Sequence, residues 1–119
     1  MPVRVLIVDD SAPFREVARE VLLQRGYEVV GEVDTAAAAI EAADRLAPDA
    51  MLVDVRLPDA SGFEVAEALA RRSGDPAVLL ASADRSTPDQ EVIRASGARG
   101  FVLKSTLATT DFSEFWPQT

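Results

Sequence analysis

Residues 3–10 read Val-Arg-Val-Leu-Ile-Val-Asp-Asp, an apolar run that ends in two acidic residues. The run is too short for a helix and is rich in β-branched residues, which predicts a strand buried on both faces. Pro13 is suited to the first turn of a helix, and apolar residues then recur at helical spacing as far as residue 22. The N-terminal part of the chain therefore predicts a buried strand followed by an amphipathic helix.

The same alternation continues along the chain. Further strands are predicted at 27–33, 50–53, 77–81 and 100–103, and further helices at 35–46, 63–70 and 88–95. Buried strands that alternate with amphipathic helices predict a (βα)5 fold of the α/β class, a doubly wound parallel five-stranded sheet with helices on both faces. We predict a single domain over residues 1–119, in which the atypical C-terminal segment 105–119 holds one short helix at most.

Composition excludes several classes of function. The 119 residues include 12 Lys and Arg against 20 Asp and Glu, a formal net charge of −8, which argues against nucleic acid or an anionic membrane as the main partner. The chain has no Cys and no His, which excludes thiol chemistry and His-based catalysis. No apolar run approaches the roughly 20 residues of a membrane span, and the N-terminus lacks the form of a signal peptide, so we expect a cytoplasmic location.

Polar side chains stand where the predicted strands end. Asp9 and Asp10 end the first strand, Asp54 the third, Ser82 the fourth, and Lys104, the single lysine of the chain, the fifth. Ligands of open parallel sheets lie beyond the carboxyl ends of the strands. We therefore expect these five side chains to converge on one edge of the sheet.

The convergence predicts phosphoryl chemistry with a metal ion. Three carboxylates in one pocket repel each other and raise each other's pKa unless a cation joins them. An oxygen-only ligand set suits Mg²⁺, and Lys104 and Ser82 can donate hydrogen bonds to phosphoryl oxygens. Asp54 can attack a phosphorus atom to give an acyl phosphate. Each acid alone is explained by a turn or a helix cap, but capping does not predict the whole set.

Four segments carry a resemblance to a known family. They are Leu-Ile-Val-Asp-Asp-Ser at 6–11, the stretch 51–65 around Asp54, Val-Leu-Leu-Ala-Ser-Ala at 78–83, and 95–105 with Gly-Phe-Val-Leu-Lys at its centre. In this order, from about residue 3 to 105, the chain resembles the receiver domain of bacterial two-component response regulators, of the stand-alone, chemotaxis-regulator type. The resemblance implies a flavodoxin-like strand order 2-1-3-4-5 and a shortened fifth helix.

The resemblance also implies a role for each site residue. Asp54 matches the phosphoacceptor, Asp10 a direct Mg²⁺ ligand, Asp9 a ligand through water, and the backbone carbonyl of Arg56 a further ligand beside Asp54. Ser82 matches the switch hydroxyl, and Phe101 matches the switch aromatic residue. Lys104 matches the lysine that contacts the phosphoryl oxygens, and Ala83 matches a small residue beside the phosphate. Arg56 and Asp84 match the two variable positions that flank the phosphate.

The implied function is a switch and not a turnover enzyme. A sensor histidine kinase or a phosphotransfer protein would supply the phosphoryl group, and a downstream protein target would recognise the modified form. The face formed by the fourth helix, the fifth strand and the fifth helix would be read by that target or would form a homodimer. No direct nucleic-acid contact is expected.

Departures from the family pattern leave other interpretations open. Ser105 stands where the family usually has Pro after a cis peptide, so we expect a trans or a strained cis bond and a shifted loop. Phe112, Phe115 and Trp116 share one helical face, which either packs on the sheet or presents rings to a partner. We expect a stand-alone receiver, with two alternatives: a phosphorylation-independent binding module, or a receiver fragment of a DNA-binding regulator.

Two unrelated functions fit the topology less well. An aspartyl-phosphate hydrolase normally carries a second acid two residues after its nucleophile, and that position is Arg56. A flavodoxin-like flavin binder needs a phosphate-cradling loop after the first strand, where Asp9 and Asp10 would repel the flavin phosphate.

Overall fold

The sheet confirms the predicted class and strand order. The computed structural model describes residues 2–72, 74–85 and 88–117. Its five strands are all parallel, in the order β2-β1-β3-β4-β5. They are β1 (Arg4–Val8), β2 (Glu28–Val33), β3 (Ala50–Asp54), β4 (Ala77–Ser82) and β5 (Gly100–Leu103).

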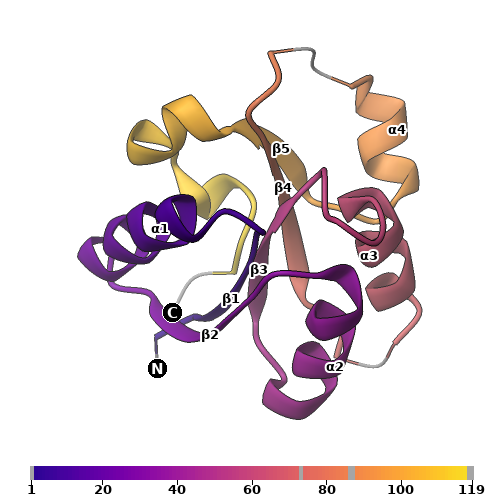
Figure 1. Ribbon diagram of the computed structural model, residues 1–119, viewed down its shortest axis with the longest axis horizontal. Helices are drawn as coiled ribbons and strands as arrows, with labels where there is room; N and C mark the ends of the chain where they lie inside the picture. Colours follow the sequence, from indigo (N-terminus) through magenta and orange to yellow (C-terminus); the bar gives the residue numbers. More distant parts are fainter. Residues whose placement is uncertain (1, 73, 86–87, 118–119) are drawn as a thin grey trace.

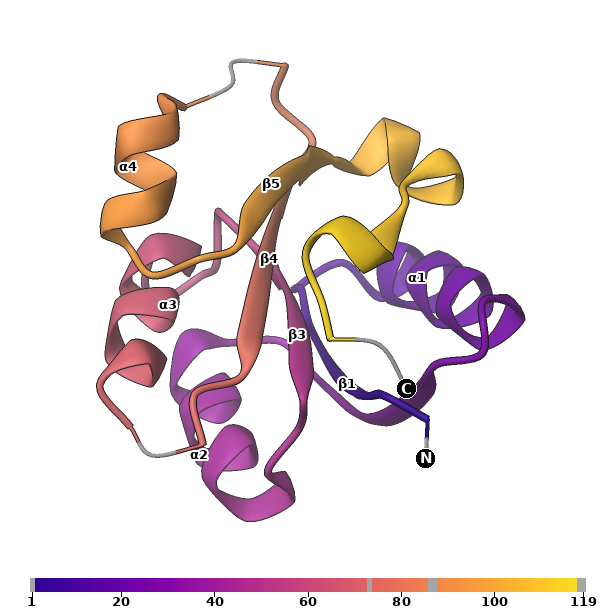
Figure 2. The same cartoon turned by 180° about the vertical axis from the view of Figure 1, so that it is seen from behind.

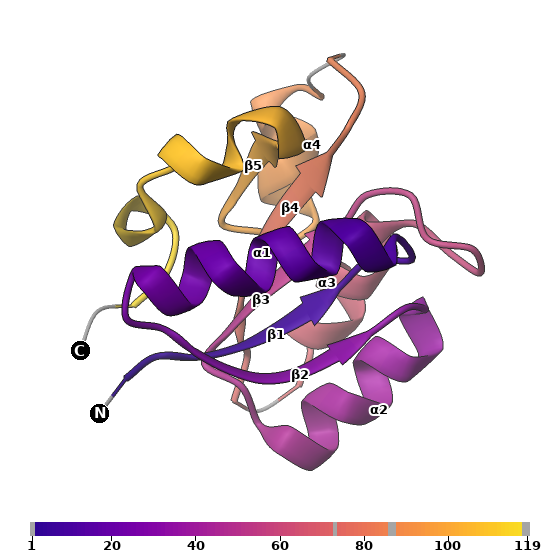
Figure 3. The same ribbon diagram turned by 60° about the vertical axis from the view of Figure 1, so that its left-hand side comes forward.

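Helices cover both faces of this sheet (Figure 1). They are α1 (Ala12–Gln24), α2 (Ala36–Leu46), α3 (Gly62–Ala70) and α4 (Gln90–Ala95). Helix α1 lies on one face together with the C-terminal segment, and α2, α3 and α4 lie on the other (Figures 1 and 3). Two 3₁₀ helices, η1 (Lys104–Thr109) and η2 (Phe112–Glu114), complete the described chain.

Local sequence explains where the helices begin. The Ser11 hydroxyl accepts a hydrogen bond from the backbone N–H of Phe14 at 3.3 Å, which caps α1, and Ser61 forms a capping box with Glu64 at the start of α3. Helix α4 was predicted to begin at Pro88, which is wrong by two residues. Asp89 has extended backbone angles and is the N-cap, so the first helical residue is Gln90.

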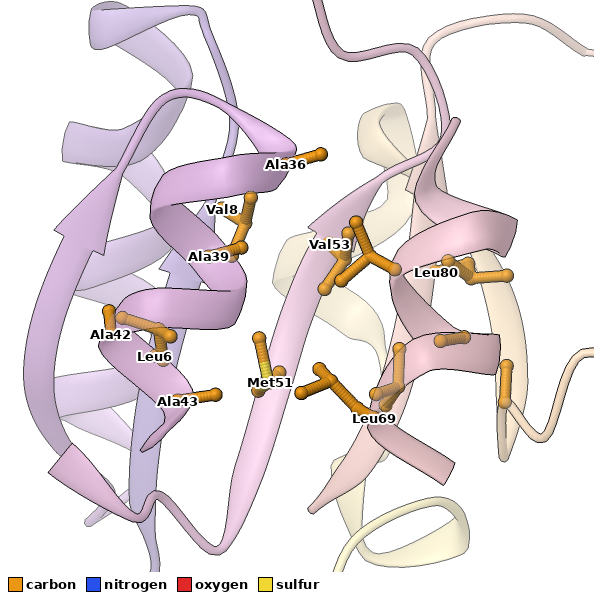
Figure 4. Packing of buried hydrophobic residues seen from close by; sticks show 14 of the residues in the cluster. Leu6, Val8, Ala36, Ala39, Ala42, Ala43, Met51, Val53, Leu69 and Leu80 are labelled. Atoms are coloured by element: carbon orange, nitrogen blue, oxygen red, sulfur yellow. The ribbon is translucent and has the colours of Figure 1, made fainter. Parts of the chain in front are cut away.

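Two apolar cores lie on the two faces of the sheet. Figure 4 shows the core between the strands and helices α2 and α3, where Leu6, Met51 and Leu80 project from the sheet toward the Ala-rich face of α2 and Leu69 of α3. On the other face, Ile7, Leu52 and Leu79 pack with α1 and with the C-terminal segment. The central strands β3 and β4 are buried along their whole length, as their continuous apolar sequences predicted.

The C-terminal segment packs beside α1 in place of a long fifth helix (Figure 2). Phe112 and Trp116 are buried and stack with ring centroids 4.9 Å apart, and Tyr27 meets both rings edge-on. Of the two alternatives for these aromatic residues, packing against the sheet is the one observed, although Phe115 is only half-buried. The prediction of one short helix at most was wrong, because the segment forms two 3₁₀ helices; residues 118 and 119 lie outside the described residues.

Arg25, the residue after α1, binds the C-terminal segment through hydrogen bonds and a cation–π contact. Its guanidinium donates to the backbone carbonyl of Thr110 at 2.6 Å and to that of Ala108, and it lies 5.5 Å from the centroid of the Phe112 ring. The peptide bond between Lys104 and Ser105 is trans, one of the two geometries expected for it. Within the described ranges, no helix is both long and apolar enough to cross a membrane.

Candidate functional site

The turn between β1 and α1 fixes the first pair of acids. Asp9 follows the last residue of β1 and is 1% exposed, whereas Asp10 is exposed. One carboxylate oxygen of Asp9, Oδ1, accepts a hydrogen bond from the backbone N–H of Ser11 at 2.8 Å. Since Ser11 also caps α1, the start of the helix and the orientation of the Asp9 carboxylate are set by the same residue.

Asp54 is the last residue of the central strand β3 and is 7% exposed. Its Oδ1 accepts a hydrogen bond from the backbone N–H of Arg56 at 3.1 Å, which places the Arg56 backbone beside the carboxylate. Gly62 packs directly on the backbone at Asp54, where a Cβ atom would overlap the carbonyl oxygen of Asp54. Only glycine fits at this position, so the loop after β3 lies tightly against the strand end.

Lys104, which is distant from both acids in the sequence, forms ion pairs with the buried carboxylates of Asp9 and Asp54. Its Nζ lies 2.6 Å from Oδ2 of Asp9 and 3.3 Å from Oδ2 of Asp54. The lysine side chain is 16% exposed, so the ammonium is largely withdrawn from water. The predicted convergence of Asp9, Asp54 and Lys104 on one sheet edge is therefore observed.

The charges at this edge do not balance. One carboxylate oxygen from each of Asp9, Asp10 and Asp54 lies within 4.8 Å of the other two, and among the described residues the ammonium of Lys104 is the one cation paired with this cluster. Burial raises the pKa of Asp54 and the Asp9 carboxylate raises it further, whereas the N–H of Arg56 and the Lys104 ammonium lower it. A cluster of oxygen ligands with excess negative charge can hold a hard divalent cation, and Mg²⁺ fits this donor set.

Ser82 lies one strand away from Asp54. It is the last residue of β4 and is 6% exposed, and its hydroxyl oxygen accepts a hydrogen bond from the backbone N–H of Asp84 at 3.0 Å. In the paired register Asp54 stands opposite Ala81, so Ser82 lies one residue further along the adjacent strand. The predicted hydroxyl is thus present at the same edge as the acids.

Phe101 and Ser82 line one cavity of about 220 Å³ next to the site. Phe101 lies on β5 opposite Leu80 and is half-buried. The ion pair between Arg56 and Asp84, 3.1 Å long, joins the loops that follow β3 and β4. The other lining residues are Val55, Arg56, Phe63, Asp84 and Pro88.

Sequence reasoning missed three residues that support the site. Phe14, which the periodicity assigned to the core, also faces the Lys104 ammonium, with Nζ 4.5 Å from the ring centroid. Arg15 donates to the backbone carbonyl of Asp9 at 2.6 Å. Gly62 lay inside a quoted motif, but its close approach to Asp54 had no signal in the sequence, because a close approach depends on the path of the chain.

Comparison with known proteins places the chain in one family. Residues 5–111 match the response regulator receiver domain. The chain is 31% identical over 102 residues to the chemotaxis protein CheY of Thermotoga maritima, covering 85% of this chain and 84% of CheY. It is 35% identical over 104 residues to the transcriptional regulatory protein PdtaR of Mycobacterium tuberculosis, covering 87% of this chain but half of PdtaR.

Solved structures agree with the sequence comparison. The signal receiver domain of the putative response regulator NarL from Mycobacterium tuberculosis superposes with a TM-score of 0.78 at 34% identity, covering 91% of each chain. The chemotaxis response regulator CheY4 of Vibrio cholerae gives a TM-score of 0.79 at 27% identity, covering 92% of this chain and 95% of that one. With the sheet order and the strand-end residues already described, these similarities show that the chain belongs to the response regulator receiver domain family.

Proposed function

We propose that this chain is a phosphoacceptor switch of a two-component system, with Asp54 as the residue that takes the phosphoryl group. The observation that carries the proposal is the contact of the single lysine with two buried acids, at 2.6 Å to Asp9 and 3.3 Å to Asp54. A buried, partly neutralised carboxylate at the tip of the central strand is a nucleophile with a cation already beside it.

The transfer is a displacement at phosphorus. A carboxylate oxygen of Asp54 forms a bond to the phosphorus of a phosphohistidine on a kinase or phosphotransfer protein. The N–P bond breaks, and its electron pair stays on the imidazole nitrogen. Lys104 donates to the phosphoryl oxygens and offsets their negative charge. Hydrolysis reverses the switch, as water attacks the phosphorus and the Asp54 carboxylate and inorganic phosphate are released.

Asp9, Asp10, Asp54 and the backbone carbonyl of Arg56 would hold Mg²⁺. When bound, the ion neutralises the acids and orients the phosphoryl group. The acids support this role because their oxygens lie within 4.8 Å of one another and carry excess negative charge. The Arg56 carbonyl is included because the family resemblance implies it, and the backbone N–H of the same residue donates to the Asp54 carboxylate at 3.1 Å.

Ser82 and Phe101 would convert the modification into a change of surface. The Ser82 hydroxyl would turn from its contact with the Asp84 N–H toward the phosphoryl oxygens. The half-buried Phe101 ring would then turn further into the cavity that both residues line. A shift of the whole population needs several kcal/mol of differential stabilisation, for which new hydrogen bonds from Ser82 and Lys104 to phosphate are a source.

The phosphorylation test measures intact mass after incubation with Mg²⁺ and acetyl phosphate. We expect one added phosphoryl group on the unaltered chain, none on Asp54→Asn, none after chelation of the metal, and full addition on the matched surface variant Asp75→Asn. Absence of an adduct, with no change of melting temperature in beryllium fluoride, would instead support the phosphorylation-independent binding module.

A second candidate is the same switch serving as the receiver part of a transcriptional regulator. The chain spans about half the length of the curated relative PdtaR, whose name describes a transcriptional regulatory protein. The length of the protein isolated from its own cells tests this candidate. A product much longer than 119 residues supports it, and a product of this length supports signalling through protein contacts alone.

A further inference from the structure

We propose that Phe14 is a positioning residue for Lys104. The face of the Phe14 ring holds the Lys104 ammonium against the acids, so that the ammonium is already in place when the phosphoryl group arrives. The inference rests on the proposed function and adds a residue to it. It starts from one contact, in which the Lys104 Nζ lies 4.5 Å from the centroid of the Phe14 ring.

The ammonium lies close to groups of two different kinds, carboxylates and an aromatic ring. Its Nζ contacts the carboxylates of Asp9 and Asp54, and it also lies over the Phe14 ring. A cation within about 6 Å of a ring centroid is attracted by the negative face of the ring, and the attraction grows when water is excluded. The 16% exposure of the Lys104 side chain meets that condition.

The ring and the first acid are joined through the same short turn. The backbone N–H of Phe14 donates to the Ser11 hydroxyl at 3.3 Å, and the Ser11 N–H donates to the Asp9 carboxylate at 2.8 Å. Phe14 also packs on the core that contains α1 and the C-terminal segment. The Phe14 ring is therefore held by packing against this apolar core, and it also contacts the Lys104 ammonium near the strand ends.

A ring serves this position better than a third carboxylate or a water molecule. An additional anion would bind Lys104 firmly and compete with the phosphoryl oxygens for its protons. A ring attracts the charge but accepts no strong hydrogen bond, so the N–H groups stay available for the phosphoryl group. Positioning a charge before the reaction lowers the barrier, because no reorganisation is needed at the moment of transfer.

The direct test observes the lysine itself. Because Lys104 is the single lysine of the chain, protein labelled with ¹³Cε-lysine gives one lysine Cε–H signal. We expect this signal to be shifted upfield by the ring in the unaltered chain and in Phe14→Tyr, and to move to the ordinary lysine position in Phe14→Leu and Phe14→Met. A signal that does not move in the two ringless variants overturns the proposal.

The kinetic test separates positioning from general damage. At saturating Mg²⁺ we expect phosphorylation from acetyl phosphate to slow by roughly two- to fivefold in Phe14→Leu and Phe14→Met, which is the effect of losing one partly buried cation–π contact. The variant Phe14→Tyr, which keeps a ring, should retain the rate of the unaltered chain. On a Lys104→Gln background, Phe14→Leu should cause no further slowing. An equal slowing on that background, or a parallel loss of Mg²⁺ affinity, overturns the proposal.

The two tests also separate this inference from the function on which it rests. If the unaltered chain takes no phosphoryl group, the proposed function fails while the lysine signal still reports on Phe14. If the chain is phosphorylated normally and the ringless variants match it in rate, the role of Phe14 alone fails. The variant Phe14→Met retains most of the apolar volume and serves where Phe14→Leu does not fold.

Discussion

Replacing Phe112 with alanine is expected to lower the free energy of unfolding by about 4 kcal/mol, because this ring joins the C-terminal segment to the sheet. Phe112 is 1% exposed, and a buried Phe→Ala change costs about 3–5 kcal/mol through lost transfer energy and the remaining cavity. The change also removes the stack on Trp116, the edge contact with Tyr27 and the Arg25 cation–π contact, which places the cost above the lower end of that range.

Urea denaturation followed by far-ultraviolet circular dichroism measures this loss. Fluorescence is unsuitable because Trp116, the single tryptophan, stacks on the ring that is removed. With a slope of about 2 kcal/mol per molar urea, the midpoint should fall by about 2 M. Phe112→Leu, which keeps most of the volume, should lose less than half as much, and Val92→Ala at a 49% exposed position should stay within about 0.5 kcal/mol.

The refuting result for this reasoning is a cost below about 1 kcal/mol for Phe112→Ala with an unchanged slope. That outcome would mean that the segment does not cover the sheet in solution. The rings would then be available to a partner, which is the alternative that the sequence left open.

Three further predictions concern the site edge. Gly62→Ala should destabilise the fold by about 1–3 kcal/mol and slow phosphorylation in the mass assay, since its Cβ would overlap the Asp54 carbonyl; equal rates would show that the loop shifts freely. Asp54→Asn should raise the melting temperature at neutral pH without Mg²⁺. Burial raises the pKa of Asp54 in the folded state, so its stabilising contribution is present in acid and is lost as pH rises through that pKa; a gain that persists in acid would contradict this. Hydrogen bonds from the first two N–H groups of α2 lower the pKa of Asp59, so the stability it gives is present above its unfolded pKa and is lost as pH falls through the folded pKa. The melting temperature of Asp59→Asn should therefore lie below that of the unaltered chain at neutral pH, and the two should converge in acid; the same measurement on Asp75→Asn is the control.

The fold was predictable because its signals are local. Each strand is a short apolar run, and each helix has apolar residues at its own period, so neighbouring residues alone define the elements. The order of the strands in the sheet depends on long-range pairing that no single segment encodes, so it was inferred from a resemblance. The structure confirms this order. The start of α4 was misplaced because Pro88 and Asp89 are both suited to a helix start, and backbone angles decide between them.

Membership of the candidate site was predictable for a different reason. Parallel strands bring their carboxyl ends to one edge, so Asp9, Asp54, Ser82 and Lys104 could be grouped from position alone. Their burial and partners could not be derived in this way. That Lys104 lies closer to Asp9 than to Asp54 follows from side-chain packing at the strand ends.

The sequence by itself determined the class of the fold, the five strand-end residues and the family, because periodicity and strand ends are properties of short segments. Tertiary structure alone decided which distant residues support them. Phe14 and Lys104 meet across the sheet edge, and Arg25 holds Ala108 and Thr110 although more than 80 residues separate them in the chain. Such contacts depend on how the whole sheet twists and packs, so no local pattern of residues predicts them.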